Sequence, residues 1–414
     1  MRKILAFLLA MTMVLSLMVP TAWAAEKEDV TILYTNDIHT YIDQDLNYAK
    51  LAAYKKTFTN AILVDAGDHI QGTAYGSMDK GETIIKLMNA AGYDLATLGN
   101  HEFDYGMDGR IKVTDEWAKF PYVSCNFYNE KDGVQGTSVL DSYKVLEKGG
   151  QKIAFIGITT PESFTKSTPA YFQDASGNYI YGIAGGTDGK ALYDTVQKAI
   201  DAASAEADIV IALGHLGDDK ASQPWTSEEL IANTTGLDAF IDGHSHSTVI
   251  GKEVTDKGGN KVLLTQTGEY FGAVGQMTIK ADGTIETKLV TEITAEPDAA
   301  VKAIQDAWIA EIETQLGQKI GTAEVTLDNY DPNFGDRLVR KYGTNTGAFA
   351  ADALYYLFDN MGLDVDMAIM NGGGVRNTAI TGDLTYKTAK EIHTFGNVAC
   401  LQTITGQQLL DALE

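Results

Sequence analysis

The chain has 414 residues, of which 44% are hydrophobic and 21% are charged. This length and composition favour two or three globular domains and exclude a disordered chain, a coiled coil or a disulfide framework, since there are two cysteines. The 56 acidic residues outnumber the 32 basic ones, for a net charge of −24, so most of the surface repels nucleic acid polymers and anionic lipids. An anionic ligand must therefore be captured locally, by a metal ion or a small group of arginines.

Residues 1–24 are predicted to be a signal peptide. Arg2 and Lys3 precede an apolar run over 4–19, and Ala22 and Ala24 have the spacing of a cleavage site. The length of the apolar run leaves an uncleaved anchor as the alternative. No later stretch is apolar enough to span a bilayer, so we expect no transmembrane segment after cleavage and an exported protein that is periplasmic, extracellular or at the cell surface.

The next part of the chain alternates between strand and helix patterns. Helical periodicity covers 81–89 and 191–207. Short apolar runs that end in polar or glycine residues predict strands over 30–35, 61–64, 94–98, 208–213 and 237–241. This alternation indicates an α/β domain, in which ligands bind beyond the carboxyl ends of the strands. We expect these five strand ends to share one sheet edge.

The remainder predicts the end of this domain and the start of another. Short strands over 261–291 are expected to form an antiparallel sheet, and one helix covers 297–318. Beyond it we expect a helix over 347–360, a strand over 366–370, a tight turn over 371–376 and a helix over 406–414. The predicted boundaries are 1–24 for the signal peptide, 25–295 for the first domain, 296–320 for a connector helix and 321–414 for a second domain, which we expect to be incomplete.

Metal-ligand residues follow all five strands. They are Asp37 and His39, Asp68, Asn100 with His101, His215, and His244 with His246. Any one histidine could be an ordinary buried or surface residue, but the set can bind two divalent ions, with Asp68 able to serve both. Mixed histidine and carboxylate ligands favour Mn, Zn, Fe or Co over Ca or Mg. Two such ions hold the attacking and leaving oxygens of a phosphoryl displacement.

The order of these motifs resembles that of the calcineurin-like metallophosphoesterases. Gly99-Asn-His-Glu-Phe-Asp104 and Asn371-Gly-Gly-Gly-Val-Arg376 further resemble the secreted 5′-nucleotidase family, which includes bacterial UDP-sugar hydrolases and 2′,3′-cyclic nucleotide phosphodiesterases. The resemblance covers residues 30 to 414. It implies a metallophosphoesterase β-sandwich flanked by helices, with four layers in the order α-β-β-α, joined by a helix to an α/β substrate-binding domain.

The resemblance also implies roles for individual residues. One metal ion would be bound by Asp37, His39, Asp68 and His246, and the other by Asp68, Asn100, His215 and His244. His101 would contact the scissile phosphate, and Asp104 would orient its imidazole. In the second domain, substrate would be bound by Arg340, Asn371, Gly373, Arg376 and Phe395, of which Phe395 would stack on the base. The family's second base-stacking aromatic lies beyond the end of this chain.

The expected activity is hydrolysis of nucleoside 5′-phosphates to nucleoside and phosphate by attack of a hydroxide that bridges the two metals. A 2′,3′-cyclic nucleotide phosphodiesterase with 3′-nucleotidase activity and a UDP-sugar hydrolase are the enzymatic alternatives, and an inactive surface binding protein is the non-enzymatic one. The oligomeric state is left open. Arg337 could contact phosphate but is interpreted as a solvated surface residue, and His69 is interpreted as a local hydrogen-bonder. Cys125 and Cys400 are interpreted as buried free thiols, with a disulfide between them as the alternative.

Overall fold

The structure is a computed structural model that describes residues 27–330, 337–377 and 379–413. The predicted signal peptide lies outside these residues. Within the described ranges, no helix combines the length and the apolar character needed to cross a bilayer.

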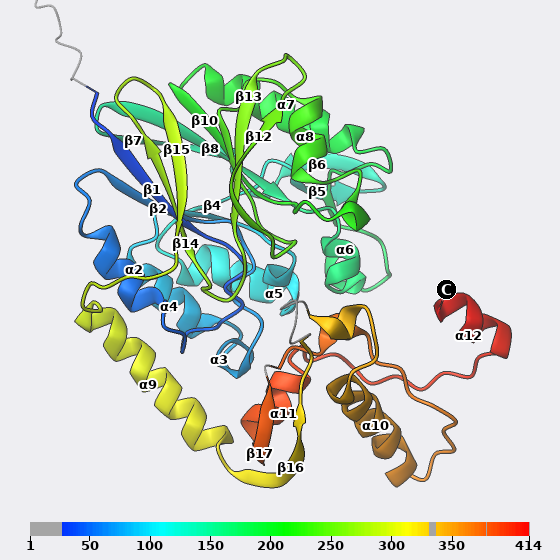
Figure 1. The fold of residues 1–414 in the computed structure, drawn as a ribbon. Helices are drawn as coiled ribbons and strands as arrows, with labels where there is room; N and C mark the ends of the chain where they lie inside the picture. Colours follow the sequence, from blue (N-terminus) through cyan, green and yellow to red (C-terminus); the bar gives the residue numbers. More distant parts are fainter. Residues whose placement is uncertain (1–26, 331–336, 378, 414) are drawn as a thin grey trace, which may run out of the picture.

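Two six-stranded sheets form the centre of the first domain (Figure 1). In the first sheet four neighbouring strands are parallel and two antiparallel strands complete one side. In the second sheet the four inner strands are parallel and an antiparallel strand completes each edge. In spatial order the first sheet contains β15 (Ile285–Val290), β14 (Val274–Ile279), β1 (Val30–Thr35), β2 (Ala61–Asp65), β3 (Leu95–Thr97) and β4 (Tyr122–Val123). The second contains β12 (Thr248–Thr255), β13 (Lys261–Thr267), β11 (Ala239–Ile241), β10 (Ile209–His215), β8 (Gln151–Thr159) and β7 (Tyr143–Lys148).

Three buried clusters show that the two sheets and their helices form four layers. Between the sheets, β-branched and aliphatic side chains such as Ile32, Val64 and Ile211 pack together. Outside the first sheet lie α2 (Tyr48–Lys55), α4 (Glu82–Ala91) and α9 (Ala299–Leu316), and outside the second lie α7 (Lys190–Ser204) and α8 (Ser227–Asn233). The predicted four-layer α-β-β-α sandwich is therefore confirmed.

Shorter elements complete the first domain. They are the small sheet of β6 (Val134–Ser138), β5 (Phe127–Lys131) and β9 (Tyr181–Ile183), and the helices α3 (Ala74–Ser77), α5 (Gly106–Ile111) and α6 (Ser163–Lys166). There are also the 3₁₀-helices η1 (His101–Phe103), η3 (Pro169–Phe172) and η4 (Lys220–Ser222), and the π-helix η2 (Lys112–Trp117).

The predicted connector helix, α9, packs on the first domain. Its buried residues Val301 and Ile312 belong to the core under the first sheet, and Trp308 Nε1 donates a hydrogen bond to the carbonyl of Tyr75 at 2.8 Å. Asp298 caps its N-terminus through the backbone N–H groups of Ala300 and Val301. The chain therefore enters the second domain from a rigidly held helix.

The second domain is a small α/β unit below the first in Figure 1. Its core contains Ala323, Leu327, Ala350, Val375, Ile380 and Ile392. Its elements are the antiparallel pair β16 (Lys319–Leu327) and β17 (Ile380–Thr385), the helices α10 (Asn345–Asn360), α11 (Tyr386–Ile392) and α12 (Gly406–Leu413), and the turns η5 (Leu338–Arg340) and η6 (Gly372–Gly374).

Three expectations about the sheets need correction. Residues 366–370 form no strand. In the 261–291 segment, β13 runs parallel to β11 in the second sheet, while β14 and β15 belong to the first. The five ligand-bearing strands also lie in two sheets, β1 to β3 in one and β10 and β11 in the other. Apolar runs predict strands but do not specify partners, because pairing depends on contacts far apart in sequence.

Candidate metal centre and substrate cavity

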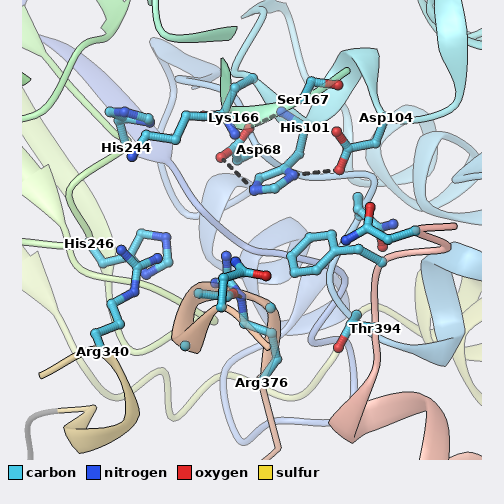
Figure 2. A pocket seen from close by; sticks show the side chains of 18 of the residues that line it. Asp68, His101, Asp104, Lys166, Ser167, His244, His246, Arg340, Arg376 and Thr394 are labelled. Carbon is cyan, nitrogen blue, oxygen red and sulfur yellow. Dashed lines mark hydrogen bonds and ion pairs between the residues drawn. The ribbon is translucent and has the colours of Figure 1, made fainter. Parts of the chain in front are cut away.

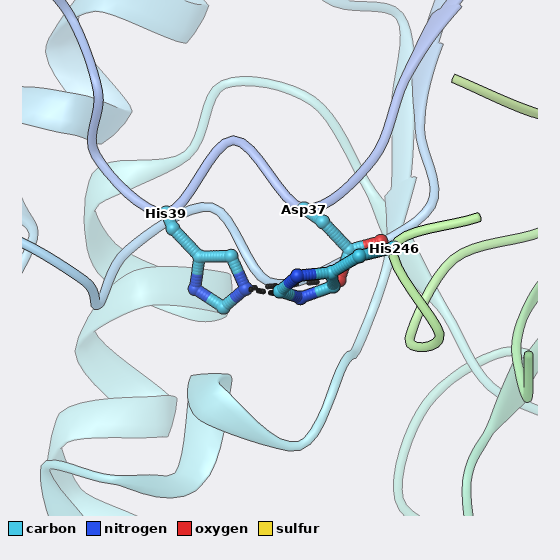
Figure 3. A group of neighbouring side chains, drawn as sticks. All are labelled: Asp37, His39 and His246. Carbon is cyan, nitrogen blue, oxygen red and sulfur yellow. Dashed lines mark hydrogen bonds and ion pairs between the residues drawn. The ribbon is translucent and has the colours of Figure 1, made fainter. Parts of the chain in front are cut away.

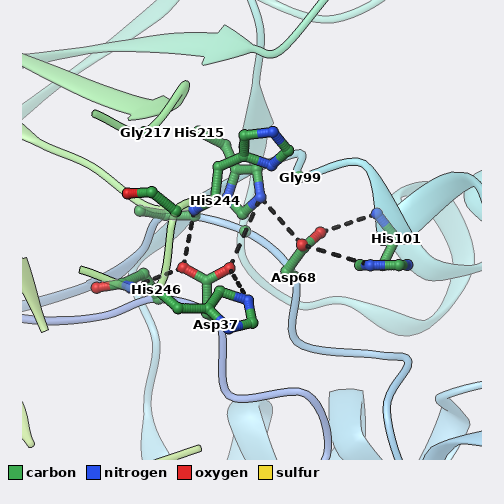
Figure 4. A network of polar contacts seen from close by, with 12 residues as sticks. Asp37, Asp68, Gly99, His101, His215, Gly217, His244 and His246 are labelled. Carbon is green, nitrogen blue, oxygen red and sulfur yellow. Dashed lines mark hydrogen bonds and ion pairs between the residues drawn. The ribbon is translucent and has the colours of Figure 1, made fainter. Parts of the chain in front are cut away.

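The loops after five strands bring the predicted metal-ligand residues together at one end of the sandwich (Figure 4). Asp37 and His39 follow β1, Asp68 follows β2, and Asn100 follows β3. The second sheet supplies His215 at the end of β10, and His244 with His246 beyond β11. The carboxyl edges of the two facing sheets thus provide one site.

Backbone strain is concentrated at these residues. Ten non-glycine residues among those described have positive φ angles, and half of them are predicted ligands: Asp37, His39, Asp68, His244 and His246. Left-handed backbone is costly for residues with a Cβ and persists where surrounding contacts enforce it, which is common at functional sites. Close approach also requires Gly99, because a Cβ there would lie 2.2 Å from Asp68 Oδ1.

The side chains form groups of the size that a divalent ion requires. One group is Asp37, His39 and His246 (Figure 3), and another is Asp68, His215 and His244, each with ligand atoms within 4.8 Å of one another. Asp37 Oδ1 lies 3.4 Å from His246 Nε2 and 3.7 Å from His39 Nε2. Asp68 Oδ2 lies 3.0 Å from His215 Nε2 and 3.9 Å from His39 Nε2, so Asp68 faces both groups. A third group combines His39 and Asp68 with His101.

Unpartnered buried atoms support metal binding here. Asp37 Oδ1, Asn100 Oδ1 and His215 Nε2 are buried without a hydrogen-bond partner, although buried polar atoms are nearly always paired. His215 Nε2 is close to Asp68 but is not aligned for a hydrogen bond with it. All three atoms are of the kinds that bind divalent transition metals, so the residues fit such ions.

The other ring nitrogen of each predicted ligand histidine is already held. His39 Nδ1 lies 2.8 Å from the Gln71 carbonyl, and His215 Nδ1 lies 2.7 Å from the Ala66 carbonyl. His244 and His246 are held by carboxylates instead of carbonyls. Glu162 contacts His244 Nε2, and Glu269 contacts His246 Nδ1. Such outer contacts fix the tautomer and the ring orientation of a metal-binding histidine.

The electrostatics of the site favour positive charge. Burial alone would lower the pKa of His215, but Asp68 and Asp37 outweigh it and raise this pKa to about 10. Conversely, burial would raise the pKa of Asp68, yet His215 and His101 hold it well below its usual range. The two buried carboxylates therefore attract cations strongly, as a metal centre requires.

His101 lies at the edge of the metal-ligand groups. Its Nε2 is 4.0 Å from Asp68 Oδ2, and its Nδ1 is 2.6 Å from Asp104 Oδ2 (Figure 2). Burial would lower the pKa of His101, but the carboxylates of Asp104 and Asp68 outweigh burial and raise it. Asp104 therefore holds one ring nitrogen of His101 by a hydrogen bond.

A cavity of about 1120 Å³ separates the metal-ligand groups from the second domain. Asp68, His101, His244 and His246 line it from the first domain, and Arg337, Arg340, Asn371, Gly373, Arg376 and Phe395 line it from the second (Figure 2). Every predicted substrate-binding residue thus faces the same cavity as the metal-ligand groups. Lys80, Lys166, Lys341 and Lys390 also line it, so an acidic protein gathers cations at this one site.

Several residues that build the site are not among those predicted from the sequence. Glu102 is fully buried and accepts hydrogen bonds from the backbone N–H groups of Asp68, His69 and Gly99 at 2.6–3.0 Å. Glu162 follows β8 and Glu269 follows β13. Both could have been found by the rule that identified the ligands, since each is a polar residue just beyond a strand.

The structure changes the interpretation of Arg337 and confirms that of His69. Arg337 is half-buried rather than solvated, and its Nη1 donates a 3.2 Å hydrogen bond to Tyr270 Oη, which also accepts from Arg376 Nη1 at 3.3 Å. The local hydrogen bonds predicted for His69 are confirmed, to Asp65 Oδ1 and Tyr122 Oη, both at 2.8 Å.

Comparison with known proteins agrees with this geometry. The calcineurin-like phosphoesterase model matches residues 30–248, more than half of the chain, and the model of the 5′-nucleotidase C-terminal domain matches residues 319–414. The chain belongs to the calcineurin-like phosphoesterase family. The motif-based resemblance is therefore confirmed, and with it the prediction that the protein is a phosphoric ester hydrolase. The family implies divalent metal ions, which the aspartate and histidine groups can bind.

Individual relatives of this family member cover most of its chain. It is 28% identical to the trifunctional nucleotide phosphoesterase YfkN of Bacillus subtilis, over 93% of this chain but 27% of that protein. It is 28% identical to the 5′-nucleotidase of Rattus norvegicus, over 97% of this chain and 73% of the relative. The crystal structure of a 5′-nucleotidase precursor from Thermus thermophilus superimposes with a TM-score of 0.71 at 25% identity, covering 89% of this chain and 74% of that one.

Proposed function

We propose that the protein is an exported phosphohydrolase that converts nucleoside 5′-phosphates to nucleoside and phosphate with two divalent ions. The observation that carries the proposal is the cavity, which has carboxylate and histidine groups on one wall and arginines with an aromatic ring on the other. The proposed ligands of the first ion are Asp37, His39, Asp68 and His246, and those of the second are Asp68, Asn100, His215 and His244.

The two ions would lower the pKa of a water molecule and neutralise phosphate charge. The chain's own contribution is orientation and proton transfer. His101 Nδ1 is held by Asp104, so Nε2 is the nitrogen available to a phosphate oxygen or to the leaving oxygen. Despite burial, the carboxylates of Asp104 and Asp68 raise the pKa of His101 and favour its protonated form, and a positive charge there stabilises the negative charge that develops during phosphoryl transfer.

The second domain would hold the rest of the nucleotide. Arg340 and Arg376 can each bind two oxygens of a phosphate through a planar guanidinium. Asn371 and Gly373 form the turn beside them, and Gly372 lies so close to Val339 that a Cβ would meet its carbonyl oxygen at 2.0 Å. Phe395 offers an aromatic face for a base.

A wider substrate range is the second candidate. The similar protein YfkN is named as a trifunctional nucleotide phosphoesterase, and the cavity contains more cations than a single phosphate needs. Initial rates on AMP, 2′,3′-cyclic AMP and UDP-glucose, measured at equal concentrations, separate a 5′-nucleotidase from a cyclic phosphodiesterase and from a UDP-sugar hydrolase.

We also propose a domain division, with a signal peptide over 1–24, the metal-binding domain over 25–295, the connector over 296–320 and the substrate-binding domain over 321–414. The separate cores of the two domains and the packing of α9 on the first support this division. Cleavage of the signal peptide is tested by the N-terminal sequence of the exported protein.

Phosphate release from AMP with added Mn²⁺ tests the activity, before and after treatment with a chelator. We expect release that chelation abolishes, that Mn²⁺ restores and that His101→Ala reduces by about 10²–10⁴-fold. Metal-dependent cleavage of bis(p-nitrophenyl) phosphate without any release from AMP would leave the metal centre standing and refute the proposed substrate. Absence of both reactions would favour a binding protein.

A further inference from the structure

Glu162 is not among the sequence-predicted site residues, yet its carboxylate lies against the proposed metal ligand His244. It lies in the loop after β8, directly after Pro161, and its side chain is 11% exposed. Its Oε2 accepts a 2.8 Å hydrogen bond from His244 Nε2 and a 2.6 Å hydrogen bond from Ser222 Oγ. The serine hydroxyl thus holds the carboxylate oxygen in place against the imidazole.

The side chain of Glu162 is not needed to start the adjacent helix α6. The Glu162 carbonyl, not its carboxylate, accepts the hydrogen bonds from the backbone N–H groups of Thr165 and Lys166 at 2.8 and 2.7 Å, and the side chain makes no capping hydrogen bond. Lys166 Nζ lies 3.8 Å from Oε1, too far for a hydrogen bond. The two hydrogen bonds of the carboxylate are therefore those with His244 and with Ser222, which holds the carboxylate in place.

His244 connects the two metal-ligand groups. Its backbone N–H donates a 2.9 Å hydrogen bond to Asp37 Oδ2 in the first group, and its φ angle is +84°. Its imidazole belongs to the second group, with Asp68 and His215. Since Nε2–H is donated to Glu162, Nδ1 carries the lone pair that is left for a metal ion.

We propose that Glu162 is a positioning residue that selects Nδ1 of His244 as the ligand of the second metal ion. This inference rests on the proposed two-metal function. A charged acceptor on Nε2 fixes the tautomer, restrains ring rotation and makes Nδ1 a stronger donor. His39 and His215 are held by backbone carbonyls, which remain when a side chain is replaced. The Glu162 carboxylate can be removed by substitution, so its role can be tested.

The test is Mn²⁺ binding to the metal-free full chain, followed by titration calorimetry and by electron paramagnetic resonance. We expect Glu162→Ala to bind the second ion about 10–100-fold more weakly, with the first ion unchanged. Glu162→Gln should lose less, because its amide oxygen can still accept from Nε2–H. At one to two equivalents of Mn²⁺, the wild type should give the signal of a coupled pair and Glu162→Ala that of a single ion.

Asp219→Asn is the matched control, because Asp219 lines the same cavity. Its carboxylate accepts a hydrogen bond from the backbone N–H of Ala221, whereas that of Glu162 accepts one from a histidine ring. We expect it to bind both ions as the wild type does. Circular dichroism and thermal unfolding of the metal-free variants show whether each is folded.

Folded Glu162→Ala protein that binds both ions with wild-type affinity would overturn the inference, as would an equal loss in Asp219→Asn. A wild-type chain that takes up no Mn²⁺ would overturn the proposed function as well. The two failures are distinguishable, because failure of the proposed function is seen in the wild type and failure of this inference only in the variants.

Discussion

The ring of Phe395 stacks on the imidazole of His101, with centroids 5.0 Å apart and an angle of 18° between the planes. These residues come from different domains, and the guanidinium carbon of Arg376 lies 5.0 Å from the centre of the same phenyl ring. His101 therefore covers one face of the aromatic ring that we expect to bind a nucleobase. A nucleobase that stacks on Phe395 must therefore share this ring with His101 and Arg376, or the second domain must move.

Substitution of Phe395 should weaken nucleotide binding. Stacking of a base on an aromatic side chain contributes about 1–3 kcal/mol, so Phe395→Ala should raise the KM for AMP by about 5–150-fold. Steady-state kinetics with AMP and with ribose 5-phosphate measure this effect, since only AMP has a base. Phe349→Ala, at an exposed position on α10, serves as the control and should leave both KM values unchanged. An equal rise for the two substrates would argue against base stacking.

Asp104→Asn should lower kcat with little change in KM. The neutral amide removes the charge that orients His101 and raises its pKa, and the loss of such a partner costs about 10–100-fold. The loss should be smaller with p-nitrophenyl phosphate than with AMP, since p-nitrophenolate leaves without protonation. Asp108→Asn, on exposed surface two residues into α5, should match the wild type. If both substrates lose equally, His101 does not protonate the leaving group.

Glu102→Gln should destabilise the fold and the site together. The Glu102 carboxylate is fully buried and binds three backbone N–H groups in the Asp68 and Gly99 loops. An amide directs its NH₂ group at one or two of these donors, and a buried donor without an acceptor costs about 1–3 kcal/mol. We expect the free energy of unfolding to fall by about 2–4 kcal/mol in denaturant titration. Unfolding at the wild-type denaturant concentration would contradict this role.

One cysteine should react with thiol reagents in the native protein. Burial raises the pKa of the Cys125 thiol to about 12, whereas Cys400 is exposed, which corrects the expectation that both are buried. A raised thiol pKa means less thiolate at a given pH, about one molecule in 10⁴ at pH 8. Ellman's reagent should therefore titrate one thiol in buffer and two in guanidinium chloride. Native Cys400→Ser protein should have no thiol that reacts with Ellman's reagent, and a rapid reaction of this variant would show that Cys125 is accessible.

Sequence patterns predicted most individual elements. The helices expected over 81–89, 191–207, 297–318 and 347–360 correspond to α4, α7, α9 and α10, and each of the five apolar runs contains a strand. The strand predicted over 366–370 is wrong, because an apolar run next to a glycine turn has a strand pattern whether or not a partner strand exists. Here no neighbouring strand among the described residues provides hydrogen bonds for it, and the segment remains irregular.

The candidate site was predictable to the extent that its residues follow strands. Asp37, Asp68 and His215 were found because a polar residue at the end of a buried strand is unusual. A phosphate contact for Arg337 was the less favoured interpretation, because an arginine in a polar stretch is usually solvated. Its contact with Tyr270 depends on how the second domain docks against the first.

The types of the candidate ligands, their order and their places after buried strands can be read from the sequence, because hydrophobic runs and turn residues are local properties. That the strand ends of two different sheets meet at one site follows from the three-dimensional packing instead. Packing of the sheets through the side chains between them brings Asp37 and Asp68 from one sheet against His215 from the other. Strand alternation along a chain fixes neither the partners in a sheet nor the sheet that faces it, since both depend on contacts between distant residues.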